Sequence, residues 1–177
     1  SVYVEAAEKV FDLVDRIERD GIALHHVDLG GGLGIRYRDE ETIDAAAYAG
    51  AVRQALGGRR HELLFEPGRF LVAEAGVLLT RVAYLKPGET HDYAIVDAAM
   101  NDLLRPALYA AWHPVEPVHP RAGVARRWQI VGPVCESGDF LAHDRELVLE
   151  QGDLLAVGAA GAYAMAMSSN YNARPRA

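Results

Sequence analysis

The spacing of apolar residues changes near Gly76, and this change constrains the fold more than any other feature of the sequence. Before it, segments with the apolar spacing of a helix alternate with short buried runs. These segments are residues 2–20, 24–29, 42–56 and 63–65. Such alternation is typical of parallel α/β architecture. We therefore expect an α/β region over residues 1–76, with Thr42 as the cap of the second helix and helix persisting through Ala75.

After Gly76 the helical spacing gives way to short runs that alternate or are rich in β-branched residues, separated by turns rich in glycine and proline. The runs are residues 77–85, 93–96, 128–131, 146–149 and 154–157. This pattern predicts a mostly antiparallel β domain over residues 77–177. Residues 113–127 contain three prolines, which favours a surface loop.

Length and charge limit the classes of protein to which the chain can belong. Its 177 residues are enough for one good core, or for one domain and part of another. A net charge of -7 argues against binding to duplex nucleic acid, which requires a basic face. The single cysteine excludes an internal disulfide framework, and no apolar run approaches the ~20 residues that span a bilayer. We expect a soluble, cytoplasmic protein with neither nucleic acid nor membrane as a partner.

The first candidate site is the stretch VDLGGGLGI, residues 27–35. Glycines at the end of a strand let backbone amides approach an anion closely, so Gly30, Gly31 and Gly32 are candidates for binding a phosphate group. The spacing also matches the methyltransferase loop that holds S-adenosylmethionine, whereas the dinucleotide fingerprint fails because position 35 is Ile. A tight connection without a ligand is the third alternative.

The second candidate site is FEPGRF, residues 65–70, which directly follows a predicted strand. Glu66 could pair with a protonated ring nitrogen, and Arg69 could bind a carboxylate with two parallel hydrogen bonds. Gly68 completes the turn between them. The alternative is a salt-bridged surface turn.

The third candidate site is VDAAMNDLLRPALY, residues 96–109. If the segment is helical, Arg105 and Tyr109 lie four residues apart and could converge on one anion. Pro106 makes a continuous helix uncertain. The alternative is a solvated arginine beside a packed tyrosine.

The fourth candidate site surrounds the only cysteine, in GPVCESGDFLAHDR, residues 132–145. Cys135 precedes Glu136, and Asp139 follows in the same glycine-punctuated turn. A thiol can donate a proton near neutral pH, so Cys135 is a candidate catalyst, with Tyr163 as a possible partner downstream. A buried, inert cysteine is the alternative, and no histidine has the spacing of a metal ligand with it, so we expect no metal.

Taken in order, these motifs resemble the pyridoxal-phosphate-dependent decarboxylases with an alanine-racemase-like fold, above all those that act on diaminopimelate. The resemblance covers essentially the whole chain and extends through GDLLAVGAAGAYAMAMSSNYNARPR, residues 152–176. It implies that residues 1–76 are the last units of a parallel (β/α) barrel. It also implies conversion of meso-2,6-diaminopimelate into L-lysine and carbon dioxide, with pyridoxal 5'-phosphate as the cofactor.

The resemblance also implies roles for the candidate residues. The glycine loop and the turn from Glu66 to Arg69 would hold the cofactor, with Glu66 at the pyridine nitrogen and Tyr163 contacting both cofactor and substrate. Substrate would be bound by Arg69, Arg105, Tyr109, Glu136 and Tyr163. Cys135 would donate the proton that replaces carbon dioxide. Cys135 and Glu136 would act in the site of a second copy, so the resemblance implies a homodimer with shared sites.

One departure from the family concerns lysine. The family uses a lysine that forms a Schiff base with the cofactor, and the chain has only Lys9, on the first helix, and Lys86, in a turn. Neither suits that role. We therefore expect the chain to be a C-terminal fragment of a longer enzyme, inactive alone. Its residues 1–75 would dock on the β domain, pair with another chain or be poorly ordered, because a cut barrel exposes strand edges.

Two other functions remain open from the sequence. A small S-adenosylmethionine-dependent methyltransferase would explain residues 28–34, but it leaves EPGR and CESGD without a role. A non-catalytic dimerisation or binding module derived from the decarboxylase fold would explain the missing lysine.

Overall fold

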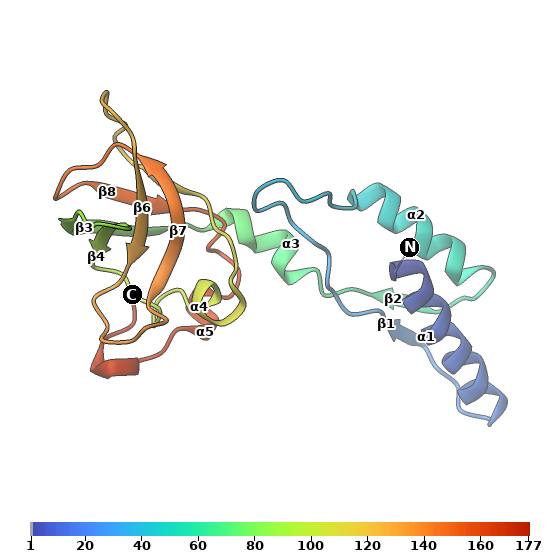
Figure 1. The fold of residues 1–177 in the computed structure, drawn as a ribbon. Coiled ribbons are helices and arrows are strands. Elements are labelled where there is room, and N and C mark those ends of the chain that lie inside the picture. Colours follow the sequence, from blue (N-terminus) through green and yellow to red (C-terminus); the bar gives the residue numbers. More distant parts are fainter. Residues whose placement is uncertain (1) are drawn as a thin grey trace. The chain divides into compact units, whose positions relative to one another are not determined.

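The computed structural model describes residues 2–177, which form two compact units. Unit 1 comprises residues 2–35 and 41–70, and unit 2 comprises residues 36–40 and 71–177 (Figure 1). Helix α3 (Gly68–Val72) spans the point of division, which falls a few residues before the boundary expected near Gly76. In the part of the chain that is described, no helix is both long and apolar enough to cross a membrane.

Unit 1 is a strand–helix–strand unit preceded by a helix. Helix α1 (Val2–Arg19) packs on α2 (Ala45–Leu56), while β1 (His26–Asp28) and β2 (Glu62–Leu64) pair in parallel (Figure 1). The amphipathic spacing of α1 buries one face against α2 and β1. This arrangement confirms the parallel α/β pattern expected for the first part of the chain, with β1 shorter than expected and β2 displaced by one residue.

The start of α2 differs from the expectation. The carboxylate of Asp44 accepts hydrogen bonds from the amides of Ala46 and Ala47, at 2.9 and 3.0 Å, so Asp44 is the N-cap. The prediction that Thr42 caps the helix was wrong. Aspartate is a somewhat better cap than threonine, and the helix begins only at Ala45.

Unit 2 is built on one curved, six-stranded sheet with the strand order β5-β8-β3-β4-β6-β7. Its strands are β3 (Leu78–Lys86), β4 (Asp92–Val96), β5 (Val115–Pro117), β6 (Arg126–Val131), β7 (Phe140–Leu147) and β8 (Leu154–Val157). All neighbouring strands are antiparallel except β4 and β6, which are parallel, so the sheet is mixed rather than purely antiparallel. Short helices follow the strands, namely α4 (Arg105–Tyr109), α5 (Ala164–Met167) and the 3₁₀ turns Ala73–Ala75 and Tyr171–Ala173.

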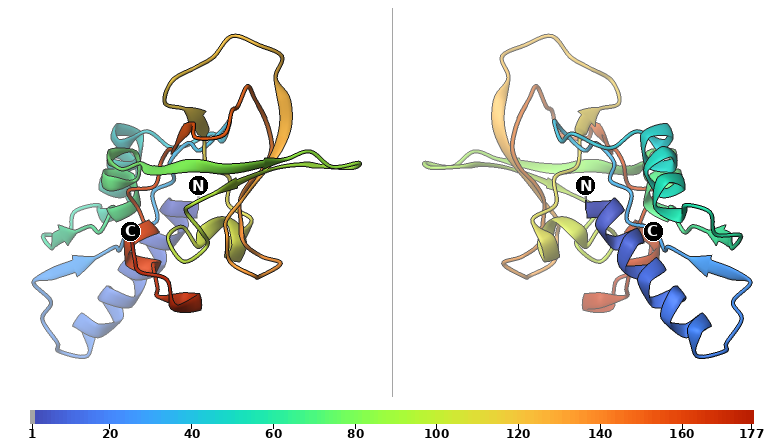
Figure 2. Two further views of the ribbon diagram at one scale, coloured as in Figure 1. Left: turned by 90° about the vertical axis from the view of Figure 1, so that its left-hand side faces the viewer. Right: turned by 90° about the vertical axis from the view of Figure 1, so that its right-hand side faces the viewer.

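The sheet of unit 2 bends until it almost closes. Figure 2 shows β3 running across the direction of β6 and β7, and the edge strands β5 and β7 contact each other. The concave side holds the core, whose fully buried members include Val82, Ile130, Leu141 and Leu155. Helix α4 packs against β7. A nearly closed sheet leaves little strand edge exposed, which stabilises the scaffold that positions the site.

Two expectations about unit 2 were wrong. Residues 113–127 contain a strand, β5, which tolerates Pro117 because it lies at the edge of the sheet and pairs only with β8. Strand β7 begins at Phe140 rather than at residue 146. A register shift opposite β6 and the positive φ of Asp144 interrupt the alternation that would have revealed it.

Helix does persist through Ala75, as α3 and the 3₁₀ turn that follows it.

Candidate functional site

In unit 1 the glycine loop turns directly after β1. The Gly30 amide donates to the Asp28 carboxylate at 2.7 Å, and Gly30 and Gly32 have φ values of +68° and +89°, which favour glycine. The Glu66 amide donates to the Gly30 carbonyl oxygen at 2.8 Å. A Cβ atom on Gly31 would lie 2.0 Å from the Glu66 carbonyl oxygen. The structure therefore brings the first two predicted sites together, and only glycine fits where they meet.

The loop leaves backbone donors free for a ligand. Among residues 2–177, the amides of Gly31 and Gly32 donate to no protein acceptor. The Gly32 carbonyl oxygen is held by the hydroxyl of Tyr3 at 3.2 Å, which fixes the orientation of the loop. Free amides beside positive-φ glycines form the type of concave backbone site that binds phosphate. This cradle, closed by the Glu66 turn, fits the phosphate of pyridoxal 5'-phosphate.

The turn of residues 66–69 presents two predicted ligand-binding groups. The Gly68 amide donates to the Glu66 carbonyl oxygen at 2.8 Å, which tightens the turn before α3. The Glu66 side chain is exposed, whereas the Nε atom of Arg69 is buried and has no hydrogen-bond partner in the described chain. A buried donor without an acceptor is unfavourable, so Arg69 is suited to an anionic ligand.

In unit 2 Arg105 lies at the start of α4 and is held on several sides. Its Nη1 donates to the hydroxyl of Tyr37 at 2.6 Å, and its guanidinium lies over the rings of Tyr37 and Tyr163, 5.0 and 5.5 Å from their centroids. Arg105 and Tyr163 were both predicted site residues, and the structure brings them together. Stacking against two aromatic rings limits the rotamers of Arg105 and so preorganises its charge.

His113 is a buried neighbour of Arg105. The ring is fully buried, and its Nδ1 lies 3.0 Å from the Gly158 carbonyl oxygen, which can only accept, so Nδ1 carries the proton. The unprotonated Nε2 then faces Arg105 Nη1 at 3.4 Å. Burial lowers the pKa of His113, and the charges of Arg105 and Arg145 lower it further. A neutral imidazole is therefore an acceptor that orients the arginine.

Tyr163 owes its position to a close backbone approach. A Cβ atom on Gly161 would lie 1.9 Å from the Val72 carbonyl oxygen, and the Gly161 amide donates to the Ala73 carbonyl oxygen at 2.9 Å. Tyr163 itself has a φ of +71°. The segment before α5 is thus fixed against residues 72–76, and this contact aims the Tyr163 ring at Arg105.

Tyr109 does not join this cluster. It lies at the end of α4 with 64% of its surface exposed, and no hydrogen bond links it to Arg105 within residues 2–177. The helix itself forms as expected, since Pro106 occupies its first turn, where no amide is needed. Convergence of Arg105 and Tyr109 on one anion stays a prediction.

The cysteine loop separates its three polar residues. Asp139 is buried and accepts from the amides of Met100 and Val134, at 2.6 and 2.8 Å, so it holds the loop together. Burial raises the pKa of Asp139. Cys135 and Glu136 are exposed instead. Asp139 is therefore the structural member of the turn, whereas the thiol and the Glu136 carboxylate face solvent.

Glu136 has a neighbour that the sequence did not suggest. The hydroxyl of Tyr171 donates to the Glu136 carboxylate at 3.3 Å, and the charge of Glu136 raises the pKa of Tyr171. Tyr37, His113 and Tyr171 are thus residues that sequence reasoning missed. Tyr37 and Tyr171 act through contacts with distant segments, and His113 contacts Arg105 from just beyond α4, so no local motif predicts these roles.

Two further expectations concern a metal ion and the Schiff-base lysine. Within the described residues, no group of three or more His, Cys, Asp or Glu side chains is arranged to hold a metal ion. Lys9 is exposed on α1, and Lys86 is exposed at the last residue of β3.

Comparison with known families identifies the fold. Residues 7–161 match the family model described as pyridoxal-dependent decarboxylase, C-terminal sheet domain. The chain belongs to the pyridoxal-dependent decarboxylase family. The resemblance drawn from the order of the motifs is thereby confirmed, and S-adenosylmethionine-dependent methyltransferases are set aside.

Individual members of the decarboxylase family agree along the whole chain. The chain is 60% identical over 175 residues to diaminopimelate decarboxylase of Pseudomonas aeruginosa, and 54% identical over 177 residues to that of Neisseria meningitidis serogroup A. These matches cover 99% and 100% of this chain but only 42% and 44% of the relatives. The chain thus spans about two fifths of the length of these relatives, which agrees with the expectation that it corresponds to a C-terminal portion.

Solved structures give the same result. The crystal structure of diaminopimelate decarboxylase from Helicobacter pylori, complexed with L-lysine, superimposes with a TM-score of 0.92 at 42% identity, over 98% of this chain and 43% of that one. Lysine/ornithine decarboxylase from Vibrio vulnificus, complexed with cadaverine, has a TM-score of 0.86 at only 25% identity. The sequence is therefore more similar to the diaminopimelate enzymes than to this lysine/ornithine enzyme, in agreement with the resemblance drawn from the order of the motifs.

Proposed function

We propose that the chain is the C-terminal portion of a diaminopimelate decarboxylase, which converts meso-2,6-diaminopimelate into L-lysine and carbon dioxide with pyridoxal 5'-phosphate. The observation that supports this most directly is the closure of the glycine loop on the Glu66 turn, where Gly31 leaves no room for a side chain. The parallel β1–α2–β2 unit would be the last part of a (β/α) barrel, and unit 2 the sheet domain that follows it.

The proposed cofactor residues lie in unit 1. When bound, pyridoxal phosphate supplies an electron sink for the bond to the departing carboxylate. The free amides of Gly31 and Gly32 bind its phosphate, in the loop that Gly30 begins, and Gly68 and Arg69 complete the turn. The Glu66 carboxylate accepts a hydrogen bond from the protonated ring nitrogen. The Schiff-base lysine would come from polypeptide outside residues 1–177, since Lys9 is exposed on α1 and Lys86 is exposed at the end of β3.

The proposed substrate residues lie mainly in unit 2. Arg105, fixed by Tyr37, Tyr163 and His113, binds the distal carboxylate of the substrate, together with Arg69 and Tyr109. Glu136 binds the distal ammonium group, and Tyr163 contacts cofactor and substrate. Cys135 donates a proton to the α-carbon after carbon dioxide has left.

The proposed assembly is a cytoplasmic homodimer with shared active sites. The exposure of Cys135 and Glu136 on a loop tied down by Asp139 supports it, because a side chain that serves a second copy must project outward.

The test is the Cys135→Ala variant of the complete enzyme that contains this chain. We expect turnover to fall by about 10²–10⁴, the usual contribution of a positioned proton donor, while the absorbance of bound cofactor stays unchanged. Asp139→Asn is the matched variant in the same loop, because it alters loop stability rather than the proton donor. Unaltered turnover in Cys135→Ala would remove the thiol from the mechanism. A complete enzyme that stays colourless with pyridoxal phosphate would refute the proposed function.

A further inference from the structure

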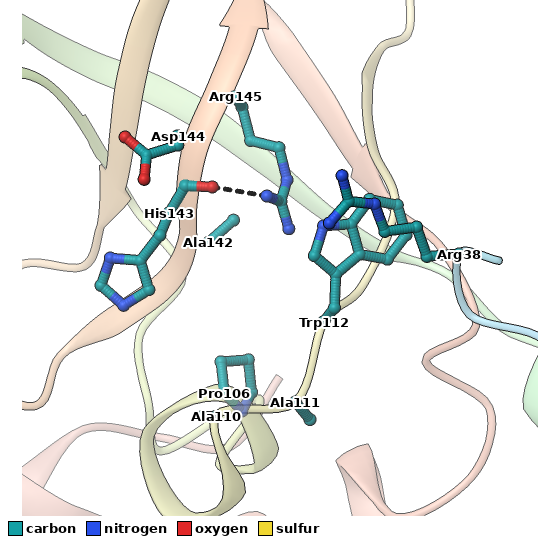
Figure 3. Close-up of a pocket in the computed structure, with 9 residues that line it drawn as sticks. All are labelled: Arg38, Pro106, Ala110, Ala111, Trp112, Ala142, His143, Asp144 and Arg145. Atoms are coloured by element: carbon teal, nitrogen blue, oxygen red, sulfur yellow. Dashed lines mark hydrogen bonds between the residues drawn. The ribbon is translucent and has the colours of Figure 1, made fainter. Parts of the chain in front are cut away.

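Unit 2 contains a cavity of about 410 Å³ between α4 and β7 (Figure 3). Its volume falls within the range of about 300–1,000 Å³ that is typical of small-molecule sites. The residues that line it are Arg38, Pro106, Ala110, Ala111, Trp112, Ala142, His143, Asp144 and Arg145. None of them was predicted from the sequence as a site residue, and none has a role in the proposed decarboxylation.

Two guanidinium groups share one indole ring in this cavity. The guanidinium of Arg145 lies 4.6 Å from the centroid of the Trp112 ring, and that of Arg38 lies 5.8 Å from it. Figure 3 shows both arginines reaching toward the same tryptophan from different segments. Arg145 also donates to the carbonyl oxygens of His143 and His113, which fixes the plane of its guanidinium. Two like charges are thus held close together, with Arg145 partly buried and Arg38 exposed.

No carboxylate of the described chain forms an ion pair with either of these two guanidinium groups. Within residues 2–177, neither Arg38 nor Arg145 forms a salt bridge with a carboxylate. The Nε atom of Arg145 is buried and has no acceptor. Burial, and then the charge of Arg38, lowers the pKa of Arg145, while the charge of Asp144 opposes this shift. Two neighbouring guanidinium groups without a salt bridge favour an anionic ligand in the cavity.

Asp144 also lines the cavity, but it forms no ion pair with Arg38 or Arg145. Its carboxylate accepts from the side-chain amide of Gln129 at 2.9 Å, and Figure 3 shows it on the other side of the β7 backbone from the guanidinium of Arg145. The remainder of the lining is largely apolar and consists of Pro106, Ala110, Ala111 and Ala142. A ligand that fits must therefore combine a negative group with an apolar body.

We propose that this cavity binds a small organic carboxylate. The carboxylate oxygens accept hydrogen bonds from the guanidinium groups of Arg38 and Arg145. The apolar body lies against Pro106 and the alanines. This site rests on the geometry of unit 2 alone and does not depend on the proposed decarboxylase function.

Trp112 provides a direct probe of the site in the 177-residue chain. Benzoate, which has a planar carboxylate and an apolar ring, should change tryptophan fluorescence in a saturable manner, and Trp112→Phe should abolish that change. The second tryptophan, Trp128, is buried in the core and should not respond. Benzamide has the same shape without the charge and should bind at least about tenfold more weakly, since charge-assisted hydrogen bonds are roughly twice as strong as neutral ones. Inorganic phosphate should also bind more weakly than benzoate, because it lacks the apolar body.

Arg38→Gln is the variant that decides the role of the charges. Arg38 is exposed, and its side chain stacks on Trp112, so the fold should survive the substitution. Benzoate affinity should fall about tenfold or more, because one of the two charged donors is lost. Arg127→Gln is the matched control, because Arg127 is exposed on β6 and pairs with Glu146 at 3.4 Å. Circular dichroism of both variants checks that they fold.

Several outcomes would overturn the proposal. Equal affinity for benzoate and benzamide, or for benzoate and phosphate, would contradict an organic carboxylate as the ligand. Unchanged affinity in Arg38→Gln would contradict the recognition by two arginines. Calorimetry on the longest natural form of the protein must also detect benzoate, because loss of binding there would mean that another part of the polypeptide fills the cavity.

Discussion

Unit 1 and unit 2 differ in how completely they bury their own strands. The buried cluster of unit 1 consists of Ala7, Phe11, Val14 and Val27, and its sheet has only two strands. Parallel strands are normally covered on both faces, yet Glu62 and Leu64 of β2 are exposed. Unit 2 has six strands around a larger core, and its edge strands contact each other. Unit 2 therefore has the features of a self-sufficient domain, and unit 1 does not.

The same difference appears in how each unit builds its candidate site. Unit 1 offers backbone groups, the amides of Gly31 and Gly32, held by a close contact between two loops. Unit 2 offers side chains, such as Arg105 and Cys135, on a rigid scaffold. A backbone site tolerates almost no added volume, whereas a side-chain site depends on which groups orient each functional residue. The two units should therefore respond to different kinds of substitution.

The largest expected effect is on the free energy of unfolding, which a core substitution should lower in one unit and not in the other. Leu141→Ala should destabilise unit 2 by about 2–5 kcal/mol, because Leu141 is fully buried, and Phe11→Ala should cost unit 1 about 3–5 kcal/mol. Both tryptophans lie in unit 2, so fluorescence during urea unfolding reports on that unit alone. Leu141→Ala should shift the fluorescence transition. Phe11→Ala should leave it in place while the amides of α1 lose protection from hydrogen exchange. A shared shift in both variants would show that the units unfold together and would break the comparison.

The next effect concerns the contact between the two loops of unit 1. Gly31→Ala would place a Cβ atom 2.0 Å from the Glu66 carbonyl oxygen, and the displacement should cost about 1–3 kcal/mol. Protection of the β1 and β2 amides, measured by hydrogen exchange, should fall. Gly50→Ala is the control, since Gly50 lies inside α2 with open space around it and should tolerate or even gain from alanine. Equal protection in the two variants would contradict the close approach on which the cradle depends.

The sequence predicted the elements whose signals are local. The amphipathic spacing of α1 and the β3 and β8 runs gave elements that match the structure within a residue or two. Strand β5 was missed because Pro117 argues against a strand unless its edge position is known. That position depends on pairing with β8, which lies far along the chain.

The candidate site divides in the same way. Motif residues such as Gly31, Glu66 and Arg105 could be identified from order and spacing alone. Tyr37 and His113 could not, because they contact Arg105 from 68 and 8 residues away and belong to no motif. Asp139 and Cys135 lie in one motif, and only the structure shows that one is buried and the other exposed.

A smaller effect is the pH dependence that His113 gives to the stability of unit 2. The ordinary pKa of histidine is 6.5, and burial lowers it in the folded state. Below pH 6.5 the unfolded chain binds a proton that the folded chain does not, so stability should fall as the pH drops toward the folded pKa. One proton contributes at most about 1.4 kcal/mol per pH unit. Above pH 6.5 this contribution should be constant.

Urea unfolding between pH 5 and pH 8, followed by tryptophan fluorescence, measures this dependence. In His113→Asn the part due to His113 should disappear, because asparagine does not titrate. His91→Asn is the control, because it removes an exposed histidine that does not contact Arg105. If the free energy of unfolding of His113→Asn still changes with pH as in the unaltered chain between pH 5 and pH 6.5, His113 is not the neutral acceptor that contacts Arg105.

The smallest effect tests how α2 begins in unit 1. Asp44→Ala should destabilise the helix by about 1 kcal/mol, because the amides of Ala46 and Ala47 lose their acceptor. Thr42→Ala should cost much less, although threonine is also a good cap, because Thr42 lies outside the first turn of the helix. Hydrogen exchange of the first amides of α2 resolves the two variants, and the fluorescence transition of unit 2 should not move in either. Should Thr42→Ala prove the more damaging change, the helix would begin where the sequence alone had placed it, and the cap assigned to Asp44 would be wrong.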